Sequence, residues 1–539
     1  MSRLGRTTGR IAVIGVVALS LSALGAIAID VVGDRGIGPP LSFEAQLCAL
    51  PEEWLELTKL GHFPGRSGQV SILPRTPMYM TTGGKGWTHS GPWDYLQKVP
   101  LVFYGPGFIP EGVEVDESVT LADVAPTIAS WLGIDIPTDG AVLPELDVDA
   151  RRPRVVVTMV WDGGGWNGLE LWPDEWPTLK SIIEDGVSYS NAIVGSSPSV
   201  TPAVHTTLGT GVFPSTHGVT DVPVRDDDGT VVDAFFDGKS ARFIEVPTLA
   251  ERWDERNDGR ALIGMIGYEP WHLGMIGKGA EEPGGDKDHA AWLIRSSNRW
   301  VARREHYELP DTFRNQSDLG MLFAEADRAD GDEDGRWMGI PLDEPSRIEE
   351  NPGFIRHHGS KLREMISKER YGADRVTDLL FTNFKQIDRL AHYFNMAAPQ
   401  VREAISGTDA ELSSLIHHLD SEVGRGDYVV IVTADHGMQP DDEVLDAYAI
   451  DPNETERDIA AEFGPVVRSV WPTQVFLLDD EMAARGVTVE DVARFLADYR
   501  LRDNATRVDQ ELFGAGPYEP RDRLFQLAVP SALLEGATC

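Results

Sequence analysis

The hydrophobic and polar positions along the chain predict strands that alternate with helices. Strands are expected where short apolar runs lie between turn residues, at 99–104, 154–161, 187–194, 375–384, 427–434 and 474–478. Helices are expected at 43–60, 121–132, 177–184, 400–423 and 488–499. Because several strands are apolar on both faces, we expect an α/β fold with a mostly parallel central sheet.

Between about 240 and 375 the pattern loosens, and Trp, Gly and charged residues dominate. We interpret this segment as an inserted cap that covers the functional site of the α/β domain. Within it, 330–335 (Asp-Gly-Asp-Glu-Asp-Gly) matches the first half of a calcium loop, but the twelfth position is Pro341 in place of Glu. A solvated acidic loop is therefore favoured over a calcium site.

The first 35 residues predict export. Arg3, Arg6 and Arg10 precede an apolar run at 11–29 that is long enough to span a bilayer. The triplet at 26–28 (Ala-Ile-Ala) also resembles a signal-peptidase site, so a cleaved signal peptide and a retained membrane anchor both remain open. In either case residues 36–539 are expected outside the cytoplasm, secreted or anchored to the membrane by this segment.

Composition narrows the choice of partners. The chain has 48 basic and 86 acidic residues, a net charge of −38, which argues against binding to a nucleic-acid polymer. If the substrate is a small anion, the positive charge at the site must be local, and bound metal is the obvious source.

Carboxylates and imidazoles gather where the predicted strands end. Because parallel strands end at one edge of a sheet, we expect these side chains to lie together. Asp and His ligands suit zinc or a similar divalent ion. Asp388 and His392 are four residues apart and can share one face of a helix. Asp435 and His436 are adjacent, so their side chains are expected to diverge toward two different ions. The residues are Asp162, Asp388, His392, Asp435 and His436.

Thr201 is the candidate nucleophile. Thr is a good helix N-cap and Pro202 suits the first helical position, so a helix is predicted to begin there. A hydroxyl at this place sees free N–H groups and the positive end of the helix dipole, which favour an alkoxide and a bound phosphate.

These residues resemble the alkaline phosphatase superfamily, in particular its nucleotide pyrophosphatase/phosphodiesterase branch. The matching segments are 162–164 (Asp-Gly-Gly), 198–201 (Pro-Ser-Val-Thr), 217–219 (His-Gly-Val), 388–392 (Asp-Arg-Leu-Ala-His) and 435–437 (Asp-His-Gly). The resemblance implies a three-layer sandwich and a hydrolase of small phosphoric esters that forms a phosphothreonine.

The resemblance also implies two divalent metal ions, with zinc the expected identity. One ion would be bound by Asp162, Asp435, His436 and Thr201. The other would be bound by Asp388, His392 and a histidine that the family has late in the chain.

Here the sequence departs from the family, because no histidine follows His436. However, segment 88–95, the strand at 99–104 and segment 123–127 look like the C-terminal end of the family's fold. We therefore infer a circular permutation in which residues 36–150 are the family's last portion, moved ahead of its first strand. His89 then becomes the missing third ligand.

Two further expectations follow from the resemblance. Spacing alone leaves Cys48 and Cys539 as partners or as unrelated thiols, but the permutation places both at one join, where a disulfide would close it. Relatives commonly carry an Asn that binds a phosphate oxygen, and this chain has Val222 in that register.

Two alternatives to a hydrolase stay open: a non-catalytic binding protein on the same scaffold, and a membrane-anchored transferase that passes the phosphoryl group to an alcohol. The retained metal ligands argue against the binding protein. Sequence alone leaves open whether monoesters or diesters are preferred.

Overall fold

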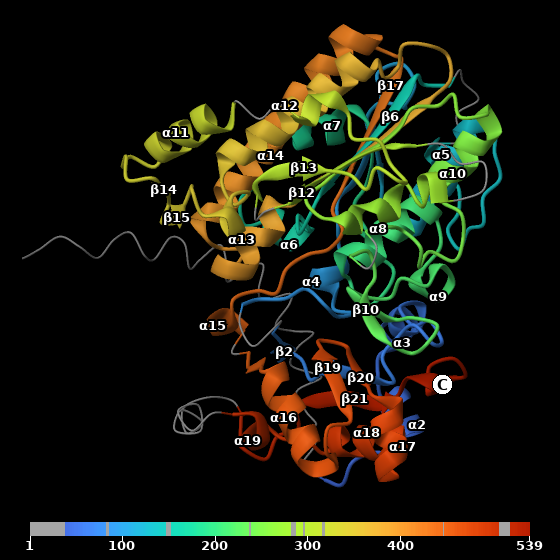
Figure 1. Ribbon diagram of the computed structural model, residues 1–539, viewed down its shortest axis with the longest axis vertical. Helices are drawn as coiled ribbons and strands as arrows, with labels where there is room; N and C mark the ends of the chain where they lie inside the picture. Colours follow the sequence, from blue (N-terminus) through green and yellow to red (C-terminus); the bar gives the residue numbers. More distant parts are fainter. Residues whose placement is uncertain are drawn as a thin grey trace, which may run out of the picture.

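A computed structural model of the protein describes residues 38–539 except 82–85, 147–151, 237–238, 282–286, 295–296, 315–317, 446 and 506–517. The expected signal peptide or anchor at 1–35 lies outside the described residues. Within the described ranges, no helix is both long and apolar enough to cross a membrane. Figure 1 shows a large α/β lobe and a smaller lobe below it.

A nine-stranded sheet forms the centre of the large lobe. Five neighbouring strands, β12, β11, β16, β6 and β17, are parallel to one another, and β13 and β3 are antiparallel to their neighbours. The mostly parallel α/β sheet predicted from the sequence is confirmed. The order is β13 (Arg299–Val301), β12 (His289–Ile294), β11 (Ile263–Ile266), β16 (Asp378–Phe384), β6 (Val155–Trp161), β17 (Tyr428–Thr433), β3 (Leu101–Tyr104), β7 (Val187–Tyr189) and β4 (Val113–Val115).

Helices cover both faces of this sheet, which makes three layers (Figure 1). Along β6, Val156 and Val160 pack into one hydrophobic core and Val155 and Val157 into the other, as the period of a strand requires. The first core includes α5 (Val124–Leu132), α8 (Thr201–Thr210) and α10 (Leu249–Asn257). The second includes α7 (Pro177–Asp185), α12 (Pro352–Glu369), α13 (Gln386–Phe394) and α14 (Pro399–Leu419).

The smaller lobe joins the two ends of the described chain, seen as blue and red ribbons side by side in Figure 1. Its antiparallel sheet has the order β19 (Val467–Trp471), β20 (Gln474–Leu477), β1 (Val70–Pro74) and β21 (Phe525–Pro530). Helices α2 (Phe43–Leu47), α16 (Pro452–Phe463) and α18 (Val489–Ala497) pack on it. Only one of these strands, at 474–478, was predicted.

Two predicted elements are each divided in the structure. The helix expected at 43–60 is α2 followed by α3 (Glu52–Leu60), because Pro51 has no N–H to continue a helix and instead stands just before α3. The strand expected at 187–194 is β7 followed by the short β8 (Ala192–Ile193), which pairs with a different strand.

Segment 240–375, interpreted from the sequence as an inserted cap, is largely part of the large lobe. Strands β11 and β12 lie within the central sheet, and α12 packs against α14. The loose pattern arose because these strands are short and separated by Gly-rich loops. Helix α11 (Leu319–Ala329) and the hairpin of β14 (Arg336–Trp337) and β15 (Ile340–Pro341) lie at the outer edge of the lobe (Figure 1).

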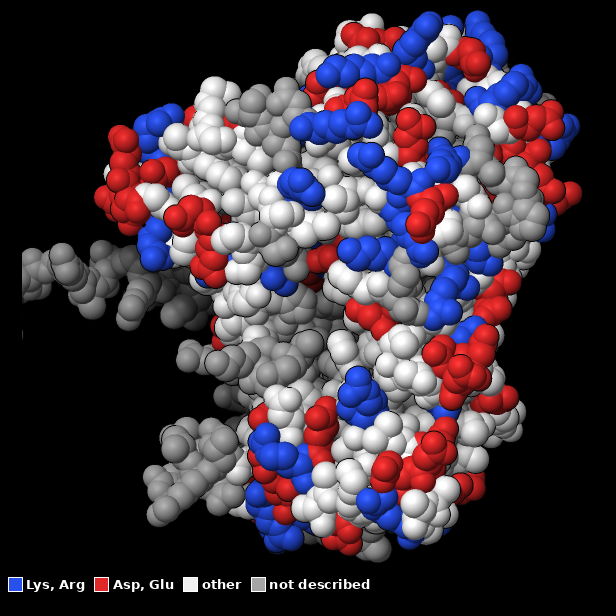
Figure 2. All heavy atoms as spheres, viewed as in Figure 1, with Lys and Arg blue, Asp and Glu red and all other residues white. Residues whose placement is uncertain are grey.

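The acidic loop after α11 is solvent-exposed. Asp327 accepts hydrogen bonds from the backbone N–H groups of Asp334 and Gly335, and Asp330 accepts one from Asp332. These contacts within the loop agree with the solvated loop that the sequence favoured. Figure 2 shows acidic and basic side chains intermixed over both lobes on this face of the molecule.

A disulfide between Cys48 and Cys539 ties the two chain ends of the smaller lobe together. The pairing predicted from the proposed join is confirmed. The bond spans 491 residues of sequence and therefore restricts the unfolded chain strongly.

We expect the double variant Cys48→Ser/Cys539→Ser to lose about 2–4 kcal/mol in free energy of unfolding, measured by urea denaturation. Wild-type protein treated with a reductant should unfold at the same urea concentration as this variant. Identical unfolding of the variant and the oxidised wild type would contradict the stabilising role of the bond.

Candidate active site

The polar residues predicted to gather at one sheet edge do so. Asp162 directly follows β6, and Asp435 and His436 come just after β17, the parallel neighbour of β6. Thr201 is the first residue of α8, and Asp388 lies in the first turn of α13. All five side chains are buried at the edge of the large lobe that faces the smaller lobe.

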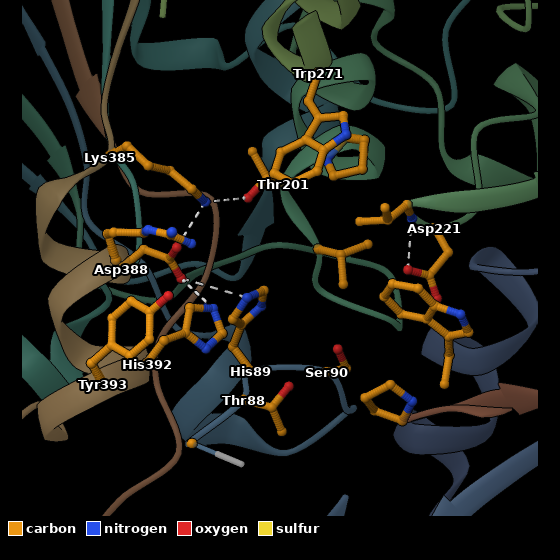
Figure 3. A pocket seen from close by; sticks show the side chains of 17 residues that line it. Thr88, His89, Ser90, Thr201, Asp221, Trp271, Lys385, Asp388, His392 and Tyr393 are labelled. Carbon is orange, nitrogen blue, oxygen red and sulfur yellow. Dashed lines mark hydrogen bonds and ion pairs between the residues drawn. The ribbon is translucent and has the colours of Figure 1, made fainter. Parts of the chain in front are cut away.

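His89 lies with Asp388 and His392, although about 300 residues of sequence separate it from them. The Nε2 atoms of His89 and His392 lie 3.5 Å and 3.2 Å from Asp388 Oδ1 (Figure 3). The three residues form a group with the spacing of metal ligands. This is the set that the sequence predicted for one of the two ions.

A second region of possible ligands adjoins the first. His436 Nε2 lies 3.6 Å from Asp162 Oδ1 and 3.5 Å from Asp435 Oδ2. His205, which the sequence interpretation did not include, adds its Nε2 atom 3.6 Å from Asp435 Oδ2. The available signal was its position on α8, one helical turn after Thr201, which places both side chains on the same side of the helix.

The three histidines around Asp388 are held with their Nε2 atoms directed at the carboxylate. Nδ1 of His89 donates to Ser199 O at 2.7 Å, and Nδ1 of His436 donates to Gly437 O at 2.9 Å. His392 donates from Nδ1 to the Trp87 carbonyl in the same way. Because a carbonyl only accepts, the Nδ1 atom of each ring carries a hydrogen, and in a neutral ring the Nε2 atom is then the one that can bind a cation. Burial lowers the pKa of His89 well below its ordinary value and also lowers that of His436, so both are neutral.

This arrangement fits a divalent cation. Asp388 Oδ1, Asp435 Oδ2 and His436 Nε2 are buried and have no hydrogen-bond partner among the described residues. Acceptors that face one another at these distances repel unless a positive ion lies between them, and buried polar atoms without partners are costly. Neutral imidazoles whose other nitrogen donates to a carbonyl, together with carboxylates, are typical of zinc ligands.

Lys385 is a second residue that the sequence interpretation missed. Its buried Nζ lies 2.8 Å from Asp162 Oδ1 and 2.8 Å from Asp388 Oδ2. Burial by itself would lower the pKa of Lys385, but Asp162, Asp388 and Asp435 outweigh it and raise that pKa, so the amine stays protonated. The available signal was its position three residues before Asp388, within reach of the same carboxylate.

Asp162 is held in a site crowded with carboxylates. Burial, and then the neighbouring charge of Asp435, raise the pKa of Asp162 well above its ordinary value, although Lys385 opposes them. A carboxylate in this position is stabilised in its charged form by any cation that binds beside it.

The hydroxyl of Thr201 is not a helix cap. Val200 is the N-cap residue of α8 and Thr201 is its first helical residue, so the helix begins one residue earlier than the capping argument assumed. Thr201 Oγ1 accepts a hydrogen bond from Lys385 Nζ at 3.1 Å and faces the cavity of Figure 3. The hydroxyl is thus available for chemistry at the N-terminus of a ten-residue helix.

A cavity of about 380 Å³ opens above Thr201 and the His89 group. The large lobe contributes Val222 and Trp271 to its walls, and the smaller lobe contributes Trp471 and Pro472. Among the described residues of segment 240–375, Trp271 lines this cavity. The volume suits a small molecule with a short apolar group.

The chain is similar to known alkaline phosphatases. Alkaline phosphatase PafA of Elizabethkingia meningoseptica is 24% identical over 327 residues, which are 53% of this chain and 60% of the relative. Alkaline phosphatase PhoV of Synechococcus elongatus is 21% identical over 337 residues, 53% of this chain and 59% of the relative. The chain therefore matches about three fifths of the length of these two relatives.

The fold is similar to that of a solved relative. The crystal structure of wild-type PafA gives a TM-score of 0.53 at 18% identity, covering 70% of this chain and 83% of that chain. At this identity the likeness concerns the fold alone, and it agrees with the mostly parallel central sheet.

The sequence also matches a defined protein family from residue 156 to residue 508. The match begins in β6 and includes Asp162, Thr201, Asp388 and Asp435. It confirms the resemblance that the sequence motifs predicted. Because the match extends over more than half of the chain, the protein belongs to the type I phosphodiesterase / nucleotide pyrophosphatase family.

Proposed function

We propose that the protein is an exported, two-metal phosphoric ester hydrolase that works through a phosphothreonine at Thr201. One observation carries the proposal: three imidazoles direct their Nε2 atoms at Asp388 Oδ1, next to a threonine hydroxyl at a helix N-terminus. Family membership and the alkaline phosphatase relatives support the reaction class.

In this proposal Asp162, Asp435, His436 and Thr201 bind one zinc ion. Bound divalent ions supply positive charge for the attacking and leaving oxygens of the reaction. His205 contacts the Asp435 carboxylate and orients it. The second ion is bound by the group of Asp388, His392 and His89.

Thr201 acts as the nucleophile. Its Oγ1 forms a bond to phosphorus while the bond from phosphorus to the ester oxygen breaks, and the hydroxyl proton ends on the departing alcohol. Water then attacks phosphorus and breaks its bond to Thr201 Oγ1, which restores the hydroxyl and releases inorganic phosphate from a monoester substrate or a phosphate monoester from a diester. The N–H groups at the start of α8 bind a phosphoryl oxygen during both steps.

The circular permutation remains part of the proposal. His89 and β3 come from the segment before residue 150, yet His89 joins the Asp388 group and β3 pairs with β17 in the central sheet. The family match begins only at residue 156, after this segment. The Cys48–Cys539 disulfide lies where the two ends would be continuous in an unpermuted relative.

Export is proposed from the arginines and the apolar run at 11–29. The disulfide supports it, because such bonds persist in oxidising compartments outside the cytoplasm. Whether the segment is cleaved can be read from the N-terminal residue of the mature protein.

Removal of metal should abolish the activity. Treatment of the purified full chain with a chelator is expected to lower the rate on p-nitrophenyl phosphate by about 10³-fold or more, and added Zn²⁺ should restore it. Metal analysis should find two zinc ions per chain. Zinc binding without any hydrolysis would instead favour the non-catalytic binding protein.

A further inference from the structure

Lys385 contacts a carboxylate of each proposed ligand set and also the proposed nucleophile. Its Nζ lies 2.8 Å from Asp388 Oδ2 and 3.1 Å from Thr201 Oγ1 (Figure 3). It also lies 2.8 Å from Asp162 Oδ1. An ammonium group has three N–H donors, so these contacts use all of them. One donor therefore points at the atom that would attack phosphorus.

The position of Lys385 is fixed by its surroundings. The side chain is 6% exposed, and its backbone immediately precedes α13. The ring of Trp271 lies 5.9 Å from Nζ on the side of the cavity. A charge held in this way is oriented before a ligand enters, which is the condition for strong electrostatic stabilisation.

The opposite wall of the cavity offers little to a phosphoryl group. Val222 has an apolar side chain, and its N–H already donates to Asp221 Oδ1 at 2.7 Å. The other oxygen of Asp221 accepts from Gln474 at 2.8 Å. This wall therefore presents a carboxylate and an apolar surface where a neutral donor would be useful.

Among the described cavity-lining residues the cationic side chains are Lys385 and Arg389. Both pair with buried carboxylates: Arg389 lies 3.6 Å from Glu349 and 3.3 Å from Glu350. What distinguishes Lys385 is that its Nζ also lies 3.1 Å from Thr201 Oγ1. Lys385 is thus the protein cation best placed to meet the substrate.

We propose that the Lys385 ammonium group binds a non-bridging oxygen of the phosphoryl group and makes the site selective for phosphate monoesters over diesters. The proposal rests on the function proposed above. A monoester dianion carries two negative charges on its phosphoryl group and a diester carries one, so an additional fixed cation favours the monoester.

The lysine keeps its proton throughout the reaction. As the Thr201 Oγ1–phosphorus bond forms and the bond to the leaving oxygen breaks, the hydrogen bond from Nζ moves from Thr201 Oγ1 to the phosphoryl oxygen. No proton is exchanged with Lys385, and the threonine proton still leaves with the alcohol.

The test uses the zinc-loaded full chain and the variant Lys385→Met, with p-nitrophenyl phosphate as monoester and bis(p-nitrophenyl) phosphate as diester. We expect wild-type kcat/KM to be higher for the monoester. The variant should lose about 10²–10³-fold on the monoester and at most about 10-fold on the diester. Inhibition by inorganic phosphate should weaken at least about 10-fold, with zinc content unchanged.

Lys361→Met is the matched control, because Lys361 is a buried lysine of α12 that pairs with Glu364 at 2.9 Å, outside the site. It should leave both ester activities and phosphate inhibition unchanged. Equal loss on both esters would overturn the proposal. So would a gain of zinc in Lys385→Met without altered selectivity, because the lysine would then only fill a metal position.

The wild type provides a readout that does not depend on the folding of the variant. An active wild-type enzyme that prefers the diester overturns the monoester inference and leaves the hydrolase proposal standing. Wild-type protein that binds zinc and hydrolyses neither ester overturns the hydrolase proposal itself.

Discussion

Replacement of Thr201 by alanine is expected to lower kcat for phosphoester hydrolysis by about 10⁴–10⁶-fold while the protein stays folded. The residue is the only proposed group that forms a bond to phosphorus, so no neighbouring group replaces it. Its hydroxyl caps no helix and bonds to Lys385, so its removal leaves the backbone of α8 unchanged. Steady-state kinetics with p-nitrophenyl phosphate and circular dichroism measure the two effects.

Thr206→Ala is the matched control on the same helix. The Thr206 hydroxyl donates to Pro202 O at 2.7 Å within α8, and Thr206 is not among the residues that line the cavity. This variant should keep its activity, and Thr201→Ser, which retains a hydroxyl, should keep measurable turnover. Full activity of Thr201→Ala would assign the nucleophile to another group. In the wild type, mass spectrometry of acid-quenched enzyme should find phosphate on the peptide that contains Thr201.

Five of the nine strands of the central sheet were predictable because each is a short apolar run, namely β3, β6, β7, β16 and β17, whereas β4, β11, β12 and β13 were not predicted. Segment 155–161 is apolar on both faces, so burial between two helix layers could be inferred from local sequence. Asp162 and Asp435 were predicted to lie together because each ends a parallel strand. Both inferences depend on short-range patterns and on one general property of parallel sheets.

The smaller lobe was not predictable in the same way. Strand β1 pairs with β20 and β21, which lie about 400 and 450 residues later, and short antiparallel strands have no pattern that identifies such distant partners. Lys385 and His205 were missed for a related reason. Lysine is normally a surface residue and a helical histidine is commonly structural. Only the packed site shows that both contact carboxylates of the proposed ligand sets.

His89 shows what the family resemblance added to the physical pattern. A histidine in a Gly-rich loop has no property that relates it to Asp388, and the sequence alone would leave it unassigned. The missing late histidine of the family, together with the reordered segments, predicted the contact. The structure places His89 Nε2 3.5 Å from Asp388 Oδ1.

Replacement of His89 by alanine is expected to lower the affinity for one of the two zinc ions by more than about 10²-fold. Loss of a residue that only orients a zinc ligand costs about 10–100-fold, and His89 is proposed to bind the ion directly. Activity on p-nitrophenyl phosphate should fall at least in proportion, because the leaving oxygen loses its ion. Zinc titration in competition with a chelator measures the affinity, and elemental analysis gives the number of ions per chain.

His62→Ala is the matched control for this variant. His62 is also buried and comes from the same N-terminal segment, but its Nε2 lies 3.9 Å from Glu535, outside the proposed ligand sets. It should keep two zinc ions and full activity. Unchanged zinc binding by His89→Ala would remove the third ligand from the proposed site and, with it, the main support for a permuted chain.

A rearranged chain that retains His89 tests the order of the segments independently of the role of His89 as a metal ligand. If residues 38–146 are placed after Cys539, Cys48 and Cys539 become close in sequence, and the chain then follows the order that the family resemblance implies. Because β1 and β3 would meet the same partners, this chain should fold, bind two zinc ions and hydrolyse the monoester at the wild-type rate. A rearranged chain that folds but binds a single zinc ion would show that His89 is a ligand only in the present order, against a simple permutation.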